Sequence, residues 1–281
     1  MEYIINIHKL NKTFGKTPAV KDLDLAVIRG EMFAFLGPNG AGKSTTLRMI
    51  CGLCRPGSGS VVVDGVELTA QKNEYKKKIG LVCQHFNVDT ELTVYENFKI
   101  HAYLYKMNKN NLEKKIHEML SAADLSDKKH ALASALSGGM KRKLQIVRAI
   151  MHSPEILFLD EPTAGLDAFS REKIWNLIKK LNSKGTTVFF TTHYIEEAQN
   201  YAMRVAIIHH GQIIKLSEPG QMITELGKWC RETFHENTTK RKYFTSREKA
   251  EQYNKDIYKK LIIRPTQLED VFISLTGEKE L

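Results

Sequence analysis

The stretch that most constrains the fold of this chain is GPNGAGKST at residues 37–45, which matches the phosphate-loop pattern G-x-x-x-x-G-K-[ST]. Residues 31–36 are typical of a short buried strand and residues 43–52 of a helix, so strand, loop and helix occur in the required order. A Gly-rich turn that binds nothing is the alternative, but all fixed positions of the pattern are present. The predicted phosphate-binding residues are Gly37, Pro38, Asn39, Gly40, Ala41, Gly42, Lys43, Ser44 and Thr45.

The chemistry of this loop suits a nucleotide with its magnesium ion. Glycines let successive backbone N–H groups point inward, and the helix start adds the positive end of its dipole. Lys43 would neutralise the β- and γ-phosphates. Ser44 would offer its hydroxyl to Mg²⁺, a hard cation that takes few protein oxygens.

Two carboxylates follow a second apolar run, ILFL at residues 156–159. Four consecutive apolar residues suit a strand buried on both faces of a parallel sheet, and open α/β sheets bind ligands at the C-terminal ends of their strands. Asp160 is therefore expected to hold Mg²⁺, and Glu161, pointing the other way along the strand, to polarise an attacking water. On its own, Asp-Glu-Pro would be a common surface turn.

Two more polar residues follow predicted strands. His193 comes after the strand at residues 186–190 and could contact the γ-phosphate or orient the water, although a lone histidine is more often structural. Gln84 follows the apolar run at residues 79–83, and its amide oxygen could reach the metal.

A second predicted anion site lies about a hundred residues further along. Ser137, Gly138 and Gly139 begin a predicted helix, with Ser137 as its N-cap. The positive end of the helix dipole and the small glycines again favour an anion there. Because one chain has two helix N-termini that can bind phosphate, we expect one nucleotide to be held between two copies of the chain. Phe14, ahead of the phosphate-loop strand, is either a core anchor or a ring that stacks on adenine.

Composition excludes few classes of protein. The 281 residues allow one large domain or one domain with an appendage. The net charge of +10 could indicate binding to nucleic acid or to an anionic membrane surface. The basic residues are spread along the chain, however, which favours a solvated protein surface with a nucleotide site. Without a bilayer-length apolar run or a signal-peptide layout at the start, the chain is expected to be soluble and intracellular.

The four cysteines, including the pair Cys51 and Cys54, are interpreted as ordinary thiols.

The order of the patterns predicts an α/β fold with two additions. Residues 3–10 are expected to be an edge strand, residues 61–68 a hairpin, and residues 93–124 a helical insertion. After residue 219 the alternation loosens; we expect helices at residues 246–260 and 266–275, a short strand at 261–263, and packing of this part on the main body. The predicted domains are residues 1–218, with a helical subdomain at about 86–152, and an accessory domain at 219–281.

Taken together, these motifs resemble the ATP-binding subunit of ABC transporters. The resemblance covers residues 3–216, and its most specific part is LSGGM, formed by Leu136, Ser137, Gly138, Gly139 and Met140. Met140 and the segment LEDVFISLTG at residues 268–277 are similar to the drug-resistance type of exporter ATPase. The resemblance implies a phosphate-loop NTPase of the ABC type: a parallel core sheet with helices, an antiparallel β subdomain, an inserted helical subdomain and a small α+β C-terminal domain.

The resemblance also implies how the site works. Two ATP molecules with Mg²⁺ would lie in a head-to-tail dimer of this chain with an identical subunit or a close paralogue, each between one phosphate loop and the partner's LSGGM segment. The dimer would drive a transmembrane permease from the cytoplasmic face of the membrane, with Gln84 and residues 93–105 facing the permease. Implied roles are adenine stacking for Phe14, Mg²⁺ binding for Ser44, Gln84 and Asp160, general base for Glu161, γ-phosphate switch for His193 and dimer contact for Asp167.

Other functions fit the sequence less well. Phe14, Met140 and Ala164-Gly165 depart from the commonest family pattern but leave the proposed catalytic groups intact, so we expect an active ATPase rather than a non-hydrolysing regulator. The alternative from another class is an ABC ATPase acting on ribosomes or DNA. Such proteins carry two cassettes or a long coiled coil, and this chain has neither, so no nucleic acid partner is expected.

Overall fold

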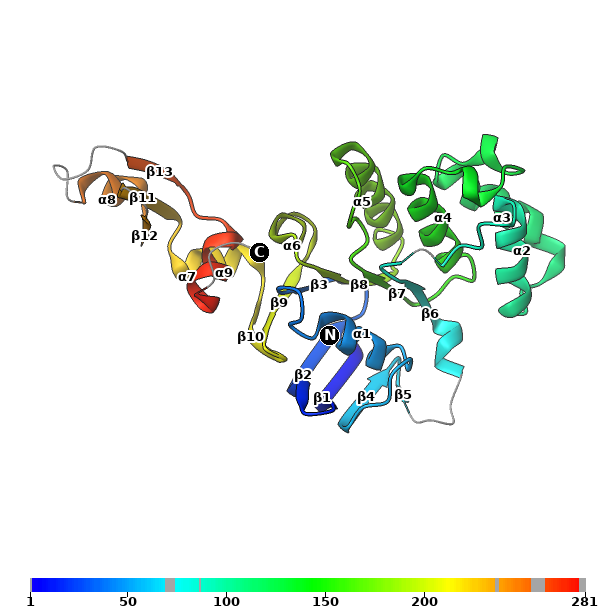
Figure 1. The fold of residues 1–281 in the computed structure, drawn as a ribbon, viewed down its shortest axis with the longest axis horizontal. Coiled ribbons are helices and arrows are strands. Elements are labelled where there is room, and N and C mark those ends of the chain that lie inside the picture. Colours follow the sequence, from blue (N-terminus) through cyan, green and yellow to red (C-terminus); the bar gives the residue numbers. More distant parts are fainter. Residues whose placement is uncertain (1, 69–73, 86, 236–237, 254–260, 278–281) are drawn as a thin grey trace.

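A six-stranded sheet forms the centre of the computed structural model, which describes residues 2–68, 74–85, 87–235, 238–253 and 261–277 (Figure 1). Its order is β10-β9-β3-β8-β7-β6; the five strands from β9 to β6 run parallel, and β10 is antiparallel to β9. The strands are β3 (Met32–Leu36), β6 (Ile79–Val82), β7 (Ile156–Asp160), β8 (Thr187–Thr192), β9 (Arg204–His209) and β10 (Gln212–Ser217).

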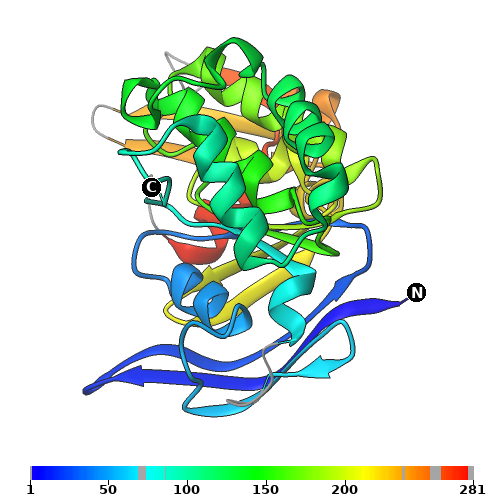
Figure 2. The same cartoon turned by 90° about the vertical axis from the view of Figure 1, so that its right-hand side faces the viewer.

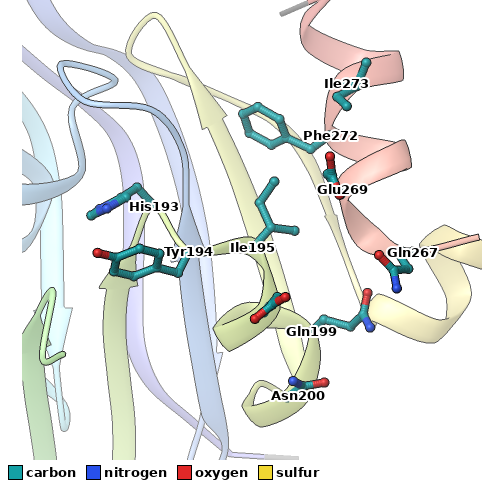
Figure 3. Close-up of a pocket in the computed structure, with 10 residues that line it drawn as sticks. His193, Tyr194, Ile195, Gln199, Asn200, Gln267, Glu269, Phe272 and Ile273 are labelled. Carbon is teal, nitrogen blue, oxygen red and sulfur yellow. The ribbon is translucent and has the colours of Figure 1, made fainter. Parts of the chain in front are cut away.

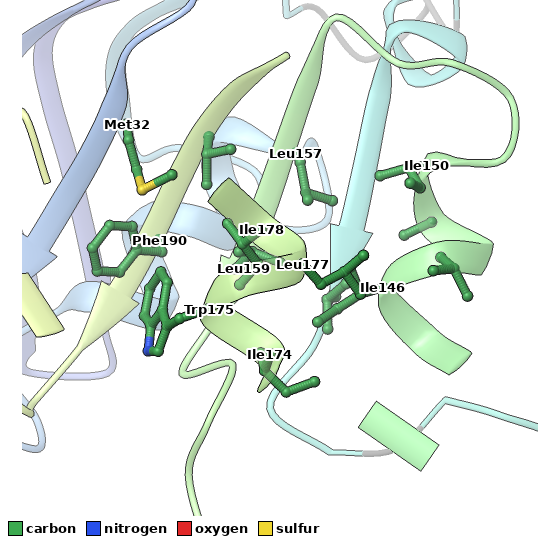
Figure 4. Close-up of a cluster of buried hydrophobic side chains, with 14 of the residues drawn as sticks. Met32, Ile146, Ile150, Leu157, Leu159, Ile174, Trp175, Leu177, Ile178 and Phe190 are labelled. Atoms are coloured by element: carbon green, nitrogen blue, oxygen red, sulfur yellow. The ribbon is translucent and has the colours of Figure 1, made fainter. Parts of the chain in front are cut away.

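The two faces of this sheet face two separate hydrophobic cores, because successive side chains of a strand point to opposite sides. On β7, Leu157 and Leu159 belong to one core while Ile156 and Phe158 belong to the other. Helices α4 (Gly138–Ile150) and α5 (Ala168–Asn182) cover the first face, where the buried Trp175 meets the sheet (Figure 4). Helix α1 (Lys43–Ile50) covers the second face. The continuous apolar runs in the sequence are thus explained by burial on both sides.

An antiparallel sheet of order β2-β1-β4-β5 packs on the α1 side and lies at the bottom of Figure 2. Its strands are β1 (Tyr3–Phe14), β2 (Thr17–Ile28), β4 (Ser58–Val63) and β5 (Val66–Glu67), with the predicted hairpin between β4 and β5. The prediction of an edge strand at residues 3–10 was wrong, because β1 pairs with β2 on one side and β4 on the other. Alternation reports only that one face is buried, and a central strand of an antiparallel sheet alternates as an edge strand does.

The predicted helical insertion is present. It contains α2 (Val94–Leu104) and α3 (Leu112–Ala122), and it leads into α4. Thr93 and Glu96 form a capping box at the start of α2, which satisfies two backbone donors of its first turn. Ser137 caps α4 as predicted, since its hydroxyl accepts a hydrogen bond from the backbone N–H of Met140 at 3.3 Å.

The C-terminal part contains a three-stranded sheet, of which only the strand at residues 261–263 was predicted. Strands β11 (Trp229–His235) and β12 (Thr238–Phe244), which were not predicted, pair antiparallel, and β13 (Leu261–Pro265) joins β11. Ser246 caps α8 (Arg247–Gln252) as expected, but residues 254–260 of the predicted helix lie outside the described residues. Among the described residues, no helix combines the length and apolar character needed to span a bilayer.

Helices α7 (Pro219–Leu226) and α9 (Leu268–Thr276) connect this part to the main body. Helix α9 packs against α7 and against α6 (Ile195–Tyr201), and its Leu268 and Phe272 belong to the core on the α5 side of the central sheet. The backbone N–H of Leu268 also donates to the Gln199 side chain of α6 at 2.7 Å. The expected packing of the C-terminal part on the main body is therefore confirmed for α7 and α9.

Candidate active site

The phosphate loop connects β3 to α1, as the sequence predicts. Gly40 and Gly42 have φ angles of 82° and 105°, in the left-handed region that favours glycine. A Cβ on Gly42 would lie 2.4 Å from the backbone oxygen of Ala19, so the loop also needs glycine for space. Local backbone geometry and close packing therefore both explain the Gly-rich sequence.

Lys43 lies beneath the loop with its side chain only 4% exposed. Its ammonium group donates to the backbone oxygens of Gly37 at 2.7 Å and Pro38 at 3.0 Å and lies 3.5 Å from a carboxylate oxygen of Glu161. Burial lowers the pKa of Lys43, and the negative charge of Glu161 opposes that effect. A desolvated cation at the base of a curled loop is suited to bind phosphate oxygens.

Asp160 ends strand β7 beside the first turn of α1. Its Oδ1 accepts hydrogen bonds from the Ser44 hydroxyl at 3.0 Å and from the Thr191 hydroxyl at 2.6 Å. The predicted pair of magnesium ligands, Ser44 and Asp160, is therefore in contact. Thr191 was not recognised in the sequence, since a threonine within a β-rich run is ordinary strand composition.

Glu161 lies immediately beyond the strand with a φ of 48°, in the left-handed region. Its backbone N–H donates to both oxygens of Thr191 at 3.1 Å. The expectation that Glu161 points away from Asp160 was wrong: the strand ends at Asp160, so pleat alternation no longer applies, and both carboxylates lie against the phosphate loop. Left-handed backbone at a non-glycine residue is common where a side chain must be aimed.

Two of the predicted residues meet Glu161 from other strands. The Gln84 amide nitrogen donates to its Oε2 at 3.2 Å, and Nδ1 of His193 lies 3.2 Å from the same oxygen. Lys43 at the start of α1, Gln84 after β6 and His193 after β8 thus surround one buried carboxylate. The sequence predicted that Gln84 and His193 follow the ends of strands, and they do so after β6 and β8.

Arg142 holds the segment after β6 in place and was not recognised in the sequence. This buried residue of α4 donates to the backbone oxygens of Cys83 at 2.6 Å and Gln84 at 2.7 Å. Burial lowers the pKa of Arg142, while the carboxylate of Asp160 raises it. The guanidinium therefore ties the first turns of α4 to the Gln84 backbone, a contact that sequence spacing does not show.

The LSGGM segment lies at the start of α4, away from the phosphate loop of the same chain. Leu136 is buried, whereas Ser137 and Gly138 are exposed. The phosphate loop follows β3, whereas α4 packs beside β6, and strands β8 and β7 lie between these two strands. Helices α1 and α4 also cover opposite faces of the sheet. Within one chain they do not form a single phosphate cradle.

Two predicted site residues, Phe14 and Asp167, are exposed. Phe14 ends β1 with its side chain exposed, at 54%, and the Lys12 ammonium lies 5.2 Å from the centre of its ring. This exposure contradicts the core-anchor alternative. Asp167 is exposed and caps α5 by accepting from the backbone N–H of Ser170 at 2.9 Å, which lowers its pKa.

The donor set at the end of β7 suits magnesium. Ser44 offers a hydroxyl oxygen, Asp160 a carboxylate oxygen and Gln84 an amide, and hard divalent cations prefer oxygen ligands of these kinds. Next to them, a pocket of about 550 Å³ begins at His193 and continues between α6 and α9 (Figure 3). The fold and the site together define a phosphate-loop enzyme that hydrolyses nucleoside triphosphates.

Comparison with known proteins places the chain in one family. Residues 20–164 match the family model described as ABC transporter. The chain belongs to this family: it is an ABC ATPase, the ATP-binding subunit of a transporter. The predicted family and fold class are thereby confirmed, and the transporter function is supported over an ATPase acting on ribosomes or nucleic acid.

Two bacterial relatives are similar to this chain over nearly its whole length. "Nod factor export ATP-binding protein I" of Rhizobium meliloti (strain 1021) is 35% identical, with 98% of this chain and 88% of the relative covered. The protein of the same name from Cupriavidus pinatubonensis is 33% identical, with 98% and 91% covered.

Solved structures agree with this assignment. cbiO1 from Clostridium perfringens, described as part of an ABC transporter complex, has a TM-score of 0.74 and 28% identity over 80% of this chain and 92% of that chain. A dimeric ATP-binding cassette in a post-hydrolysis state with ADP and Pi has a TM-score of 0.69 and 31% identity over 76% and 98%.

Proposed function

We propose that this ABC ATPase powers an exporter, in which it works with a separate transmembrane permease at the membrane face and with a second ATPase subunit. Support for export comes from the relatives, which are named as export ATP-binding proteins and match along 98% of this chain. The proposed domains are a cassette at residues 1–218, with its helical subdomain at about 86–152, and an accessory domain at 219–281.

The proposed roles follow the contacts within the site. The phosphate loop and Lys43 hold the phosphates, and Ser44, Asp160 and Gln84 hold Mg²⁺, which offsets negative charge on the phosphates when bound. Glu161 is the base that accepts a proton from the attacking water, because it is the buried carboxylate that Lys43, Gln84 and His193 surround. His193 contacts the γ-phosphate, and the exposed ring of Phe14 stacks on adenine.

One observation carries the proposal of a shared site. The phosphate loop and the start of α4 lie at the same edge of the sheet, since Arg142 of α4 binds the backbone that follows β6, but strands β8 and β7 lie between β3 and β6. The exposed Ser137 and Gly138 can therefore face the phosphate loop of a second subunit. Asp167, also exposed, would contact that subunit.

A mixing experiment tests the shared site. Lys43→Ala disables the loop half of a site and Ser137→Arg the α4 half, so each variant alone should have almost no ATPase activity. In an equimolar mixture, half of the dimers pair the two variants, and each such dimer contains one intact site. With independent sites, activity should return to about a quarter of the wild-type value, as expected for sites completed in trans. A mixture as inactive as its components would contradict the shared site.

The permease is proposed to dock on α2. Ile100, Tyr103 and Leu104 are 48%, 81% and 70% exposed on this helix, and clustered exposed apolar side chains are typical of interaction sites. Leu104→Asp should abolish copurification with the coexpressed transmembrane permease and leave basal ATP hydrolysis unchanged. Lys114→Asp, on the exposed side of α3, is the matched control. Undiminished copurification of Leu104→Asp would place the docking surface elsewhere.

A further inference from the structure

A third buried carboxylate lies behind the site, on helix α6. Glu197 is 3% exposed, and its two oxygens accept hydrogen bonds from three other segments. Oε1 accepts from the Thr163 hydroxyl and from Nε1 of Trp175, the latter at 3.2 Å. Oε2 accepts from the Thr192 hydroxyl at 2.7 Å. All three donors are themselves buried.

The donors belong to the segments that carry the reacting groups. Thr163 lies two residues after Glu161, and Thr192 immediately precedes His193. The Thr192 hydroxyl also accepts from the backbone N–H of Tyr194 at 2.9 Å. The residues before and after His193 are therefore both held through this hydroxyl. Trp175 lies on α5, the helix that begins at Asp167. The Glu197 carboxylate therefore connects the segments that carry Glu161, His193 and Asp167.

The charge of Glu197 is compensated only partly. The nearest cation is Arg171, whose Nε lies 3.9 Å from Oε1 and whose guanidinium carbon stacks 4.5 Å from the centre of the Tyr194 ring. The other contacts are neutral donors. Burying a carboxylate costs more free energy than burying an apolar residue of similar size, even with several neutral donors around it. Its hydrogen bonds instead fix the positions of the segments that donate to it.

We propose that Glu197 is a positioning residue for ATP hydrolysis: by holding Thr163 and Thr192 together, it keeps His193 and Glu161 at their 3.2 Å separation. This inference rests on the proposed roles of Glu161 and His193. It assigns Glu197 no contact with ATP, since the carboxylate faces the protein interior and acts through its two threonines.

The chemistry of the contacts predicts what Glu197→Gln changes. An amide has one acceptor oxygen and one donor nitrogen, and the indole N–H of Trp175 can only donate. The amide oxygen therefore stays with Trp175 and Thr163, and the nitrogen faces Thr192. The Thr192 hydroxyl then has no acceptor for its proton on this side chain, and the charge-assisted hydrogen bond to the carboxylate is lost, so the segment that carries His193 is held less firmly.

Kinetics of Glu197→Gln test the proposal. The kcat for ATP hydrolysis should fall about tenfold or more while KM for ATP stays within about twofold, the pattern of a loss confined to the transition state. Two variants serve as controls. Glu196→Gln changes the exposed neighbour on the same helix, and Glu31→Gln removes another buried carboxylate, which pairs with Arg204 at 2.6 Å before the start of β3. Both should keep the wild-type kcat.

A double-mutant cycle separates positioning from stability. If Glu197 acts through His193, adding Glu197→Gln to His193→Ala should lower kcat no further than His193→Ala alone. Should the Glu197 variant not fold, Thr192→Val removes only the hydroxyl and should give the same loss, while Thr192→Ser keeps the hydroxyl and should recover most of the activity.

The outcomes distinguish this inference from the function on which it rests. A wild-type kcat in folded Glu197→Gln, together with an inactive His193→Ala, refutes the positioning role alone. Additive losses in the double variant refute it as well. A fully active His193→Ala refutes the proposed role of His193 and with it the basis of the inference.

Discussion

Replacing Glu161 by glutamine is the most direct perturbation of the proposed chemistry. The substitution keeps the size of the side chain and its ability to bond Gln84, but it removes both the charge and the proton acceptor. A positioned general base contributes about 10²- to 10⁴-fold to a rate. At about 1.4 kcal/mol per tenfold, the barrier to hydrolysis should rise by roughly 3–5 kcal/mol.

Nucleotide binding should respond in the opposite direction. Glu161 lies 3.5 Å from the Lys43 ammonium, so its carboxylate competes with phosphate for this cation and repels the phosphate charge. Removing that charge should leave ATP affinity at least as high as in the wild type. The variant should therefore accumulate ATP-bound dimers that do not turn over.

Three measurements on one preparation test this prediction. Phosphate release is measured under single-turnover conditions, ATP affinity by equilibrium dialysis, and self-association by sedimentation velocity with saturating Mg-ATP. Glu196→Gln, an exposed neighbour of α6, controls for the loss of one negative charge. Hydrolysis above about a tenth of the wild-type rate would remove Glu161 from the role of base, given the range for such catalysis.

Three further substitutions probe binding and stability. Lys43→Ala should weaken ATP binding about 10- to 100-fold, since a charge-assisted hydrogen bond contributes roughly 1.5–3 kcal/mol, and unchanged affinity in a titration would contradict the phosphate assignment. Phe14→Ala should reduce ATP affinity by about 1–3 kcal/mol while Phe14→Tyr keeps it, and equal affinities of both would exclude adenine stacking. Lys78 and Arg29 hold the pKa of Asp64 below its ordinary value of 3.8. A depressed carboxyl pKa stabilises the fold above that value and loses the effect as pH falls below it, so Asp64→Asn should lower the free energy of unfolding by about 1–3 kcal/mol at pH 7, and the deficit should shrink towards pH 3 in urea titrations.

Much of the catalytic layout was predictable because it follows from strand ends. Asp160, Gln84 and His193 each come after a continuous apolar run, and parallel strands bring their C-terminal ends to one edge. This rule needs only local patterns and the order of elements. The same rule failed at Glu161, because strand alternation stops where the strand stops, and the left-handed conformation of that residue leaves no mark in the sequence.

The parts that could not be predicted depend on tertiary contacts or on polar strands. Arg142 lies in a basic run, where a charged helix surface is the ordinary interpretation, yet its side chain is buried against the backbone of Gln84. Strand β12, with the sequence TTKRKYF, pairs through its backbone, while its lysines remain exposed. Propensity and periodicity describe side chains, so neither records these backbone pairings.

Helix α6 shows why the contacts of Glu197 matter beyond one hydrogen bond. The helix has only seven residues, and its N-cap Tyr194 makes no side-chain capping bond. Helices this short are unstable in isolation, so tertiary contacts must hold α6 in place. Glu197 supplies such contacts towards Thr163 and Thr192, and Gln199 supplies one towards α9 by accepting from Leu268. Since His193 lies two residues before this helix, its position depends on how firmly α6 is held on both sides.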